Sequence, residues 1–380
     1  MNILILSNSF FPEGEAMSTR WLTFSKLLKQ LGFNVYVISL YSKEKNGSFE
    51  DVCSYESISQ SVERFDYYTL PKRLYNSCKT YIKKNRVDII FMGRMFFGFK
   101  SFRKLTKKHN IPLIIEQCEW LDKTNFKFKK MHPLYIANCL NINCFYKKAD
   151  GIVCISRFFE DFYKKKGCKT IRIPAILDSG NIEYKAHLLN SPLKIAFFGS
   201  LGGTKDLLDD FLIAFNEYHS LNKAFQFHIY GPSQADIDNL LVKNGISYST
   251  RESIFIHGKM SHKETLSAVM NSDFTFFARS NRRSSQAGFP TKFAESMALG
   301  TPVITNLTGD ISLFLRDGVN GFVLNDLKKE SFFNIFDKIT MLSDDEKAAM
   351  RAEARKTAEL NFDYKNYCAQ FDSFLNKLLK

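Results

Sequence analysis

Short apolar runs of strand length, each followed by a helical pattern, recur along the chain in two successive series. The first run, Ile3–Ser7, precedes a segment in which Trp21, Phe24 and Leu28 recur at helical spacing until Gly32. Strands that alternate with helices predict parallel sheets with helical crossovers. We therefore expect two α/β units in tandem, joined near residues 178–192. The expected strands lie at 3–7, 34–40, 87–92, 111–117, 151–156, 191–200, 225–231, 253–258, 273–278 and 301–305.

Composition excludes several classes of protein. An apolar content of 45% is enough for full cores, so disorder is not expected. The eight cysteines are scattered, with no Cys-x-x-Cys pair and no zinc spacing, which favours reduced thiols in a cytoplasmic protein. The segment MNILILSNSFFP lacks the features of a signal peptide, and no stretch approaches the 18 apolar residues of a membrane span.

The positive charge is confined to one half of the chain. Residues 1–190 contain 31 basic and 17 acidic residues, whereas residues 191–380 contain 22 of each. This asymmetry indicates that the first half meets an anionic partner, such as nucleic acid, anionic lipid or a phosphorylated acceptor. A basic surface that is merely solvated is the alternative.

Two glycine-containing loops follow expected strands and open helices. One surrounds Gly14, and the other contains Gly199 and Gly202 with Lys205 at its end. Free backbone N–H groups at such a helix start suit a phosphate, and glycine allows close approach of a ligand. Neither loop matches a P-loop or a dinucleotide-binding fingerprint, so ordinary turns remain the alternative.

A third candidate anion site opens the stretch GFPTKFAESMALGTPVI at residues 288–304. Pro290 fits a first helical turn, which predicts unpaired N–H donors at Thr291, Lys292 and Phe293. A diphosphate would suit these donors. Glu295 lies about 7 Å further along the helix, where its carboxylate would accept two ribose hydroxyls. A surface glutamate on an amphipathic helix is the alternative.

Together these stretches resemble the retaining GT-B glycosyltransferases. The relevant family is the large family 4-like group that includes sucrose synthase, bacterial mannosyltransferases and capsule and O-antigen transferases. The resemblance runs over essentially the full length and depends on the order and spacing of the motifs. The matching segments are Pro12–Ala16, Leu28–Val35, Ala149–Ile152 with Ser156, Ile173–Asp178, Gly199–Lys205, Glu295–Ile304 and Asp317–Leu324.

The resemblance implies a GT-B fold, in which two Rossmann-like domains have parallel sheets that face each other across a cleft. Residues 1–180 would bind the acceptor and residues 190–361 the nucleotide sugar. Residues 362–380 would form a helix that crosses back to the first domain. The implied reaction transfers a sugar from a nucleoside diphosphate sugar with retention of configuration, without a metal or another cofactor.

The resemblance also assigns roles to individual residues. Lys205, Glu295 and Glu119 are the expected catalytic residues, and no residue is expected to bind metal. The expected donor-binding residues are Gly14, Gly199, Ser200, Gly202, Lys205, Lys259, Met260, Gln286, Gly288, Phe289, Pro290, Thr291, Lys292 and Glu295.

Three positions depart from the pattern of the family. Ser200 stands where the family has a phosphate-binding arginine, and Ala287, beside Gln286, replaces the first of two glutamates. The family's loop histidine is not evident, and Glu119 is the candidate in its place. Alternative functions are therefore a catalytically weak nucleotide-sugar-binding partner of an active transferase and a nucleotide-sugar epimerase. The candidates to replace the missing arginine are Arg279, Arg282 and Arg283.

Basic and aromatic residues interleave at residues 94–110 and 125–135. This pattern suits an anionic membrane surface, and it favours a polyprenyl-diphosphate-linked or glycan acceptor at the cytoplasmic face of the cell membrane. Such an acceptor implies the assembly of a bacterial surface polysaccharide. The alternative is that Phe96, Phe97 and Phe99 pack against the sheet. We expect no nucleic-acid partner, because no RNA-binding module is recognised.

Overall fold

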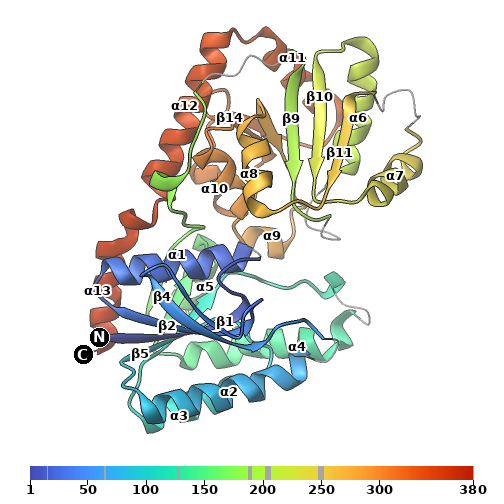
Figure 1. The fold of residues 1–380 in the computed structure, drawn as a ribbon. Coiled ribbons are helices and arrows are strands. Elements are labelled where there is room, and N and C mark those ends of the chain that lie inside the picture. Colours follow the sequence, from blue (N-terminus) through green and yellow to red (C-terminus); the bar gives the residue numbers. More distant parts are fainter. Residues whose placement is uncertain are drawn as a thin grey trace. The chain divides into compact units, whose positions relative to one another are not determined.

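A computed structural model describes residues 1–14, 16–63, 66–125, 129–186, 191–201, 207–246 and 252–379. The chain divides into two compact units, each an α/β structure (Figure 1). The first unit comprises Met1–Asp178, Ala287–Phe289 and Asp363–Lys380, and the second comprises Ser179–Gln286 and Pro290–Phe362. The expected α/β fold class with two sheets is confirmed.

The first unit contains an eight-stranded sheet with the order β3-β4-β2-β1-β5-β6-β7-β8. All neighbours are parallel except β3 and β4, which pair antiparallel at one edge. The strands are β1 (Asn2–Phe10), β2 (Asn34–Tyr41), β3 (Asn46–Phe49), β4 (Cys53–Ser59), β5 (Ile89–Met92), β6 (Leu113–Gln117), β7 (Gly151–Cys154) and β8 (Thr170–Arg172).

Helices cover both faces of this sheet (Figure 1). Phe24 of α1 packs against Phe91 and against Phe371 of α13, with ring centroids 5.0 and 5.8 Å apart. α2, α3 and α4 lie on the opposite face. Both faces are thus apolar, which explains why β5, β6 and β7 are continuous buried runs. The helices are α1 (Ala16–Gln30), α2 (Asp66–Lys84), α3 (Phe99–Lys108), α4 (Pro133–Leu140), α5 (Arg157–Lys164) and α13 (Cys368–Leu379).

The second unit contains a six-stranded parallel sheet with the order β11-β10-β9-β12-β13-β14. Phe211 anchors the core on one face, because its ring stacks 4.0 Å from Phe276 and also meets Phe332 and Phe336. Val269 and Leu299 pack on the other face. The strands are β9 (Leu193–Phe198), β10 (Phe225–Tyr230), β11 (Ile254–Gly258), β12 (Phe274–Phe276), β13 (Val303–Asn306) and β14 (Gly321–Leu324).

Seven α-helices are described in the second unit. α6 and α11 supply the aromatic core, and α8 and α10 lie on the opposite face of the sheet (Figure 1). No helix in the described ranges is long and apolar enough to cross a membrane. The helices are α6 (Asp209–Leu221), α7 (Gln234–Lys243), α8 (His262–Met270), α9 (Arg283–Ala287), α10 (Thr291–Ala298), α11 (Lys329–Met341) and α12 (Asp344–Asn361).

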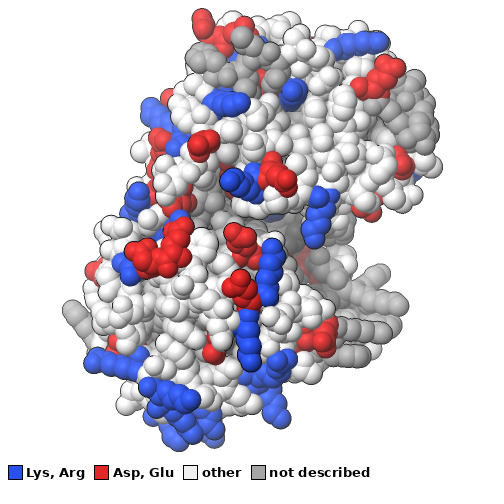
Figure 2. All heavy atoms as spheres, viewed as in Figure 1, with Lys and Arg blue, Asp and Glu red and all other residues white. Residues whose placement is uncertain are grey.

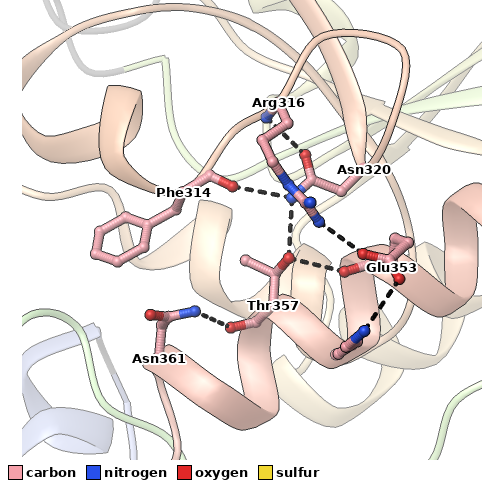
Figure 3. A network of polar contacts seen from close by, with 7 residues as sticks. Phe314, Arg316, Asn320, Glu353, Thr357 and Asn361 are labelled. Carbon is pink, nitrogen blue, oxygen red and sulfur yellow. Dashed lines mark hydrogen bonds and ion pairs between the residues drawn. The ribbon is translucent and has the colours of Figure 1, made fainter.

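A polar network ties the loop before β14 to α12 (Figure 3). The fully buried Asn320 side chain accepts a hydrogen bond from the Arg316 N–H and donates to the Phe314 carbonyl and the Thr357 hydroxyl, at 2.8 to 2.9 Å. Arg316 also pairs with Glu353 at 2.6 Å. The loop is therefore fixed by side chains where it lacks regular backbone pairing.

The structure departs from the sequence expectation in three places. The hairpin of β3 and β4 and the edge strand β8 were not expected, because β3 and β4 are mostly polar and β8 has only three residues, so all three give little apolar signal. The final segment is not one helix. A short 3₁₀ turn at Tyr364–Tyr367 precedes α13, because the Asp363 side chain accepts a hydrogen bond from the Lys365 N–H.

Candidate functional site

Three glycines with positive φ lie just at the carboxyl ends of adjacent strands in the second unit. Gly199, Gly231 and Gly258 follow or end β9, β10 and β11, with φ of 116°, 115° and 66°. The Gly199 N–H donates to the Tyr230 carbonyl, and the Gly231 N–H donates to the Gly258 carbonyl. A Cβ on Gly231 would lie 2.2 Å from the Gly199 oxygen, so no other residue fits there without a backbone shift. We call these three residues the glycine corner.

The ammonium group of Lys292 lies beside the glycine corner. A Cβ placed on Gly199 would lie 3.2 Å from Lys292 Nζ. The same ammonium lies over the rings of Phe197 and Phe277, 4.7 and 5.6 Å from their centroids. These rings come from β9 and from the end of β12, so the cation is held by aromatic faces. The next residue after Gly199, Ser200, is exposed.

Glu295 lies one helical turn after Lys292 on α10. The residue is buried, with 7% of its surface exposed. His262 Nε2 lies 2.8 Å from Glu295 Oε1. Burial of a carboxylate without a hydrogen-bond donor is costly, so this contact compensates for part of the desolvation.

At the start of α10, one of the three backbone N–H groups expected to be unpaired is hydrogen-bonded. Pro290 is the N-cap, and the Phe293 N–H donates to the Pro290 carbonyl at 3.0 Å. The expectation that the Phe293 N–H is an unpaired donor is therefore wrong, because the first turn closes on itself. Thr291 and Lys292 occupy the first turn as expected.

The other expected donor-site residues of the second unit have diverse environments. The Gln286 amide is engaged at both ends, since it accepts from the Gly309 N–H at 2.8 Å and donates to Asn281 Oδ1 at 2.6 Å. Lys259 is exposed, and Met260 packs against the core between the sheet and α8. Gly202 and Lys205 lie outside the described residues.

Arginines near α9 were the expected replacements for the missing phosphate-binding arginine. The Arg279 backbone is held in both directions by Asn306, which accepts from its N–H and donates to its carbonyl. Arg282 and Arg283 are exposed at the start of α9. The described contacts place Lys292 rather than an arginine beside Gly199.

The remaining expected residues belong to the first unit. Gly14 has φ of 142°, and a Cβ there would lie 2.9 Å from the Cβ of Phe10. Gly288 and Phe289 are buried and group with this unit. Glu119, after β6, pairs with the Arg94 guanidinium at 3.0 Å. Lys292 and Glu295 thus lie on one helix of the second unit, and within the first unit Glu119 pairs with Arg94.

The sequence analysis missed two residues. Arg94 orders Glu119 and lies 4.9 Å from the Phe96 ring centroid. His262 binds Glu295 across 33 positions of the chain. A capping box at Ser261 and Glu264 marks the start of α8 in the sequence, but that signal does not specify the partner of His262. Across the described ranges no group of three or more His, Cys, Asp or Glu residues is arranged to hold a metal ion.

Comparisons with known proteins bear on this site. Residues 192–341 match the family described as glycosyl transferases group 1. No curated protein matches the chain by sequence. Among solved structures, sucrose-phosphate synthase from Thermosynechococcus elongatus superposes with a TM-score of 0.77 at 14% identity, over 99% of this chain and 98% of that one.

Two further structures show the same fold. Anabaena HepE, in complex with UDP and glucose, has a TM-score of 0.68 at 15% identity, over 99% of this chain and 100% of its own. The lipopolysaccharide outer core galactosyltransferase WaaB has a TM-score of 0.64 at 13% identity, over 99% of both chains. At these identities the likeness establishes the fold.

Proposed function

Because residues 192–341 carry a glycosyl transferases group 1 domain and the whole chain has the GT-B fold, we propose that this protein transfers a sugar from a nucleoside diphosphate sugar to an acceptor. The complex of HepE with UDP and glucose supports a nucleotide-sugar donor. We further propose that transfer retains the anomeric configuration and needs no metal ion.

The observation that carries this proposal is the pair of charges on α10. Lys292 places a cation beside the flexible-backbone residue Gly199, and Glu295 places a buried carboxylate one turn away. A diphosphate suits the cation and the helix start, while a ribose suits the carboxylate. A nucleoside diphosphate carries an anion and a diol in one molecule, so it can engage both charges of this helix.

Lys292 gives the site a way to stabilise the leaving group. Negative charge grows on the diphosphate as the sugar leaves, and a fixed cation aimed at it lowers the barrier. Lys292 thereby takes the role of the arginine that Ser200 replaces. The resemblance to the family adds Lys205 as a second cation.

The acceptor belongs to the first unit in this proposal, and we propose that it is a polyprenyl-diphosphate-linked or glycan acceptor at the cytoplasmic face of the cell membrane. Glu119, held by Arg94, is the candidate residue on that side. Assembly of capsule or O-antigen would then be the cellular role. WaaB, a lipopolysaccharide outer core galactosyltransferase of the same fold, supports a lipid-linked glycan acceptor.

Basic side chains gather along α2 and α3 (Figure 2). Lys100, Lys104, Lys107 and Lys108 are exposed on α3. The neighbouring aromatic residue Phe99 is buried at 3% exposure, so it packs the core rather than a membrane.

Apolar exposure instead lies at α4. Met131, Ile136 and Leu140 are 82%, 46% and 44% exposed. Ile136 and Leu140 are four residues apart and share one face of the helix. We propose that α3 supplies electrostatic attraction to anionic lipid and that α4 supplies apolar contact.

A catalytically weak binding partner is the second candidate function. Ser200 and Ala287 favour it, because each lacks a charged group that the family uses at the donor. An epimerase has no observation of its own in its favour.

The test is release of nucleoside diphosphate from UDP-, GDP- and dTDP-sugars, with and without polyprenyl-diphosphate-linked oligosaccharide in anionic vesicles. The proposal expects release with one donor, dependent on acceptor and unchanged by EDTA. Loss of activity in EDTA that Mg²⁺ restores would contradict metal independence. Binding of a nucleotide sugar without release under any condition would select the binding partner.

A further inference from the structure

The contact between His262 and Glu295 has a defined direction. An ionised carboxylate accepts hydrogen bonds and does not donate them, so the 2.8 Å contact is donated by His262 Nε2–H. Within the described part of the second unit, His262 is the one hydrogen-bond partner of this carboxylate. The imidazole is more than half exposed, whereas the Glu295 side chain is 8% exposed.

The backbone that carries His262 is fixed. His262 is the first residue of α8, and the preceding Ser261 caps the helix by accepting from the Glu264 N–H. The Glu264 side chain in turn accepts from the Ser261 N–H at 2.9 Å. The imidazole therefore extends from an anchored helix start toward α10.

We propose that His262 is a positioning residue for the donor nucleotide, which holds the Glu295 carboxylate in the orientation that receives the ribose 2′- and 3′-hydroxyls. This inference rests on the proposed function, in which Glu295 binds the ribose. Nothing in the family resemblance assigns a role to His262.

The Glu295 carboxylate can accept hydrogen bonds from His262 and from the ribose at the same time. A carboxylate offers about four lone-pair sites on its two oxygens, and His262 uses one of them on Oε1. The remaining sites accept two hydroxyl donors. A glutamate side chain that is already held loses less rotamer freedom when the ribose binds, so the donor binds more tightly.

A competing interpretation makes the opposite prediction. If His262 occupied the ribose position on Glu295, the donor would have to displace it. Removal of the imidazole would then strengthen nucleotide binding, whereas the positioning role requires that removal weakens it.

The test uses the full-length protein and measures dissociation constants by calorimetry for UDP, GDP and their 2′-deoxy analogues. The variants are His262→Ala, His262→Gln, Glu295→Gln and the double variant His262→Ala with Glu295→Gln. Ser267→Ala, an exposed substitution on the same helix, is the matched control. Kinetics with the matching nucleotide sugar separate KM from kcat.

We expect His262→Ala to weaken binding of the preferred ribonucleotide about three- to tenfold, the scale for ordering one side chain. The donor KM should rise with kcat unchanged, and the preference for ribose over 2′-deoxyribose should fall. His262→Gln should restore most of the affinity, because its amide N–H donates from the place of Nε2. In the Glu295→Gln background, His262→Ala should add no further loss.

Two results separate the inference from its premise. If Glu295→Gln weakens ribonucleotide binding while His262→Ala leaves it unchanged or strengthens it, the positioning role is overturned and the ribose assignment stands. If Glu295→Gln itself leaves affinity unchanged, both the ribose assignment and the role of His262 fail. A fall in kcat alone for His262→Ala would also overturn positioning.

Discussion

At the scale of single residues, the proposed donor site contains a cation that lies over two aromatic rings. Lys292 lies over Phe197 and Phe277 beside Gly199, at the carboxyl ends of two strands. Its backbone lies in the first turn of α10, where an anion is already favoured. In the proposed function this residue stabilises the charge that develops at a leaving diphosphate.

Lys292→Met tests that role because it keeps the length and apolar stem of the side chain. We expect kcat to fall about 10²-fold with a smaller change in donor KM, since the charge of the leaving group is greatest in the transition state. Steady-state kinetics with the active nucleotide sugar measure both constants. Lys263→Met, an exposed charge-matched control on α8, should behave like the wild type. A larger effect on KM than on kcat would show that Lys292 binds the donor equally well in the ground state and in the transition state.

The paired histidines of the second sheet make stability depend on pH. Burial, together with smaller contributions from His257 and Lys194, lowers the pKa of His228 from its ordinary value of 6.5 to about 4. The unfolded chain therefore binds more protons than the folded chain between these values, so stability falls as the pH drops from 6.5 toward 4. His228 is neutral in the folded protein at pH 7.

His228→Phe removes this titration and retains an aromatic ring that stacks on Phe255. We expect the difference in Tm between pH 7 and pH 5 to be smaller in the variant than in the wild type. Thermal unfolding at the two pH values measures it. An unchanged difference would show that His228 does not set the acid sensitivity of this unit.

At the scale of secondary-structure elements, the loop before β14 is held to α12 by side chains. Asn320→Ala would remove the acceptor of the Arg316 N–H and the donor to the Phe314 carbonyl and the Thr357 hydroxyl, which still donates to the Glu353 carbonyl. We expect a loss of about 3 kcal/mol in the free energy of unfolding. Asn361→Ala removes the hydrogen bond to the Thr357 carbonyl and should cost about 1 kcal/mol. Denaturant unfolding measures the stability of both variants. Equal losses of unfolding free energy would contradict the central role of Asn320 in this network.

Helices and strands were predictable from the sequence where a local pattern of apolar residues or a helix-start residue marks them. The buried parallel strands, such as β5 and β6, are continuous apolar runs, and α10 begins after Pro290 as its sequence indicates. The β3–β4 hairpin was not predictable, because its two strands are mostly polar and contain no continuous apolar run. The contacts of the site were not predictable either, because they join residues that are far apart in sequence. These contacts are those of His262 with Glu295 and of Lys292 with Gly199. Such contacts depend on tertiary packing, which local patterns do not encode.

At the scale of the whole molecule, the charge excess of the first half predicts salt-sensitive membrane binding. The variant with Lys104, Lys107 and Lys108 changed to Glu should lose flotation with anionic vesicles, because each basic residue near the surface contributes about 1 kcal/mol. The matched control changes Lys263, Lys328 and Lys356 of the second unit, all exposed, and should retain flotation.

Two outcomes would contradict the membrane proposal. Equal flotation with neutral and anionic vesicles would remove the electrostatic attraction, and equal loss in both triple variants would show that α3 has no special role. Added salt should weaken the wild-type interaction, because counterions screen charges at the surface.

The central claim is that the second unit holds a nucleoside diphosphate with its ribose on Glu295. Calorimetric titration of UDP and GDP into the wild-type protein and Glu295→Gln tests it most directly. The account predicts saturable binding of one nucleotide by the wild type and about ten- to hundredfold weaker binding by the variant, because a hydrogen bond to a charged group is lost. Equal affinity of the two proteins for that nucleotide, or binding of neither nucleotide by the wild type, would contradict it.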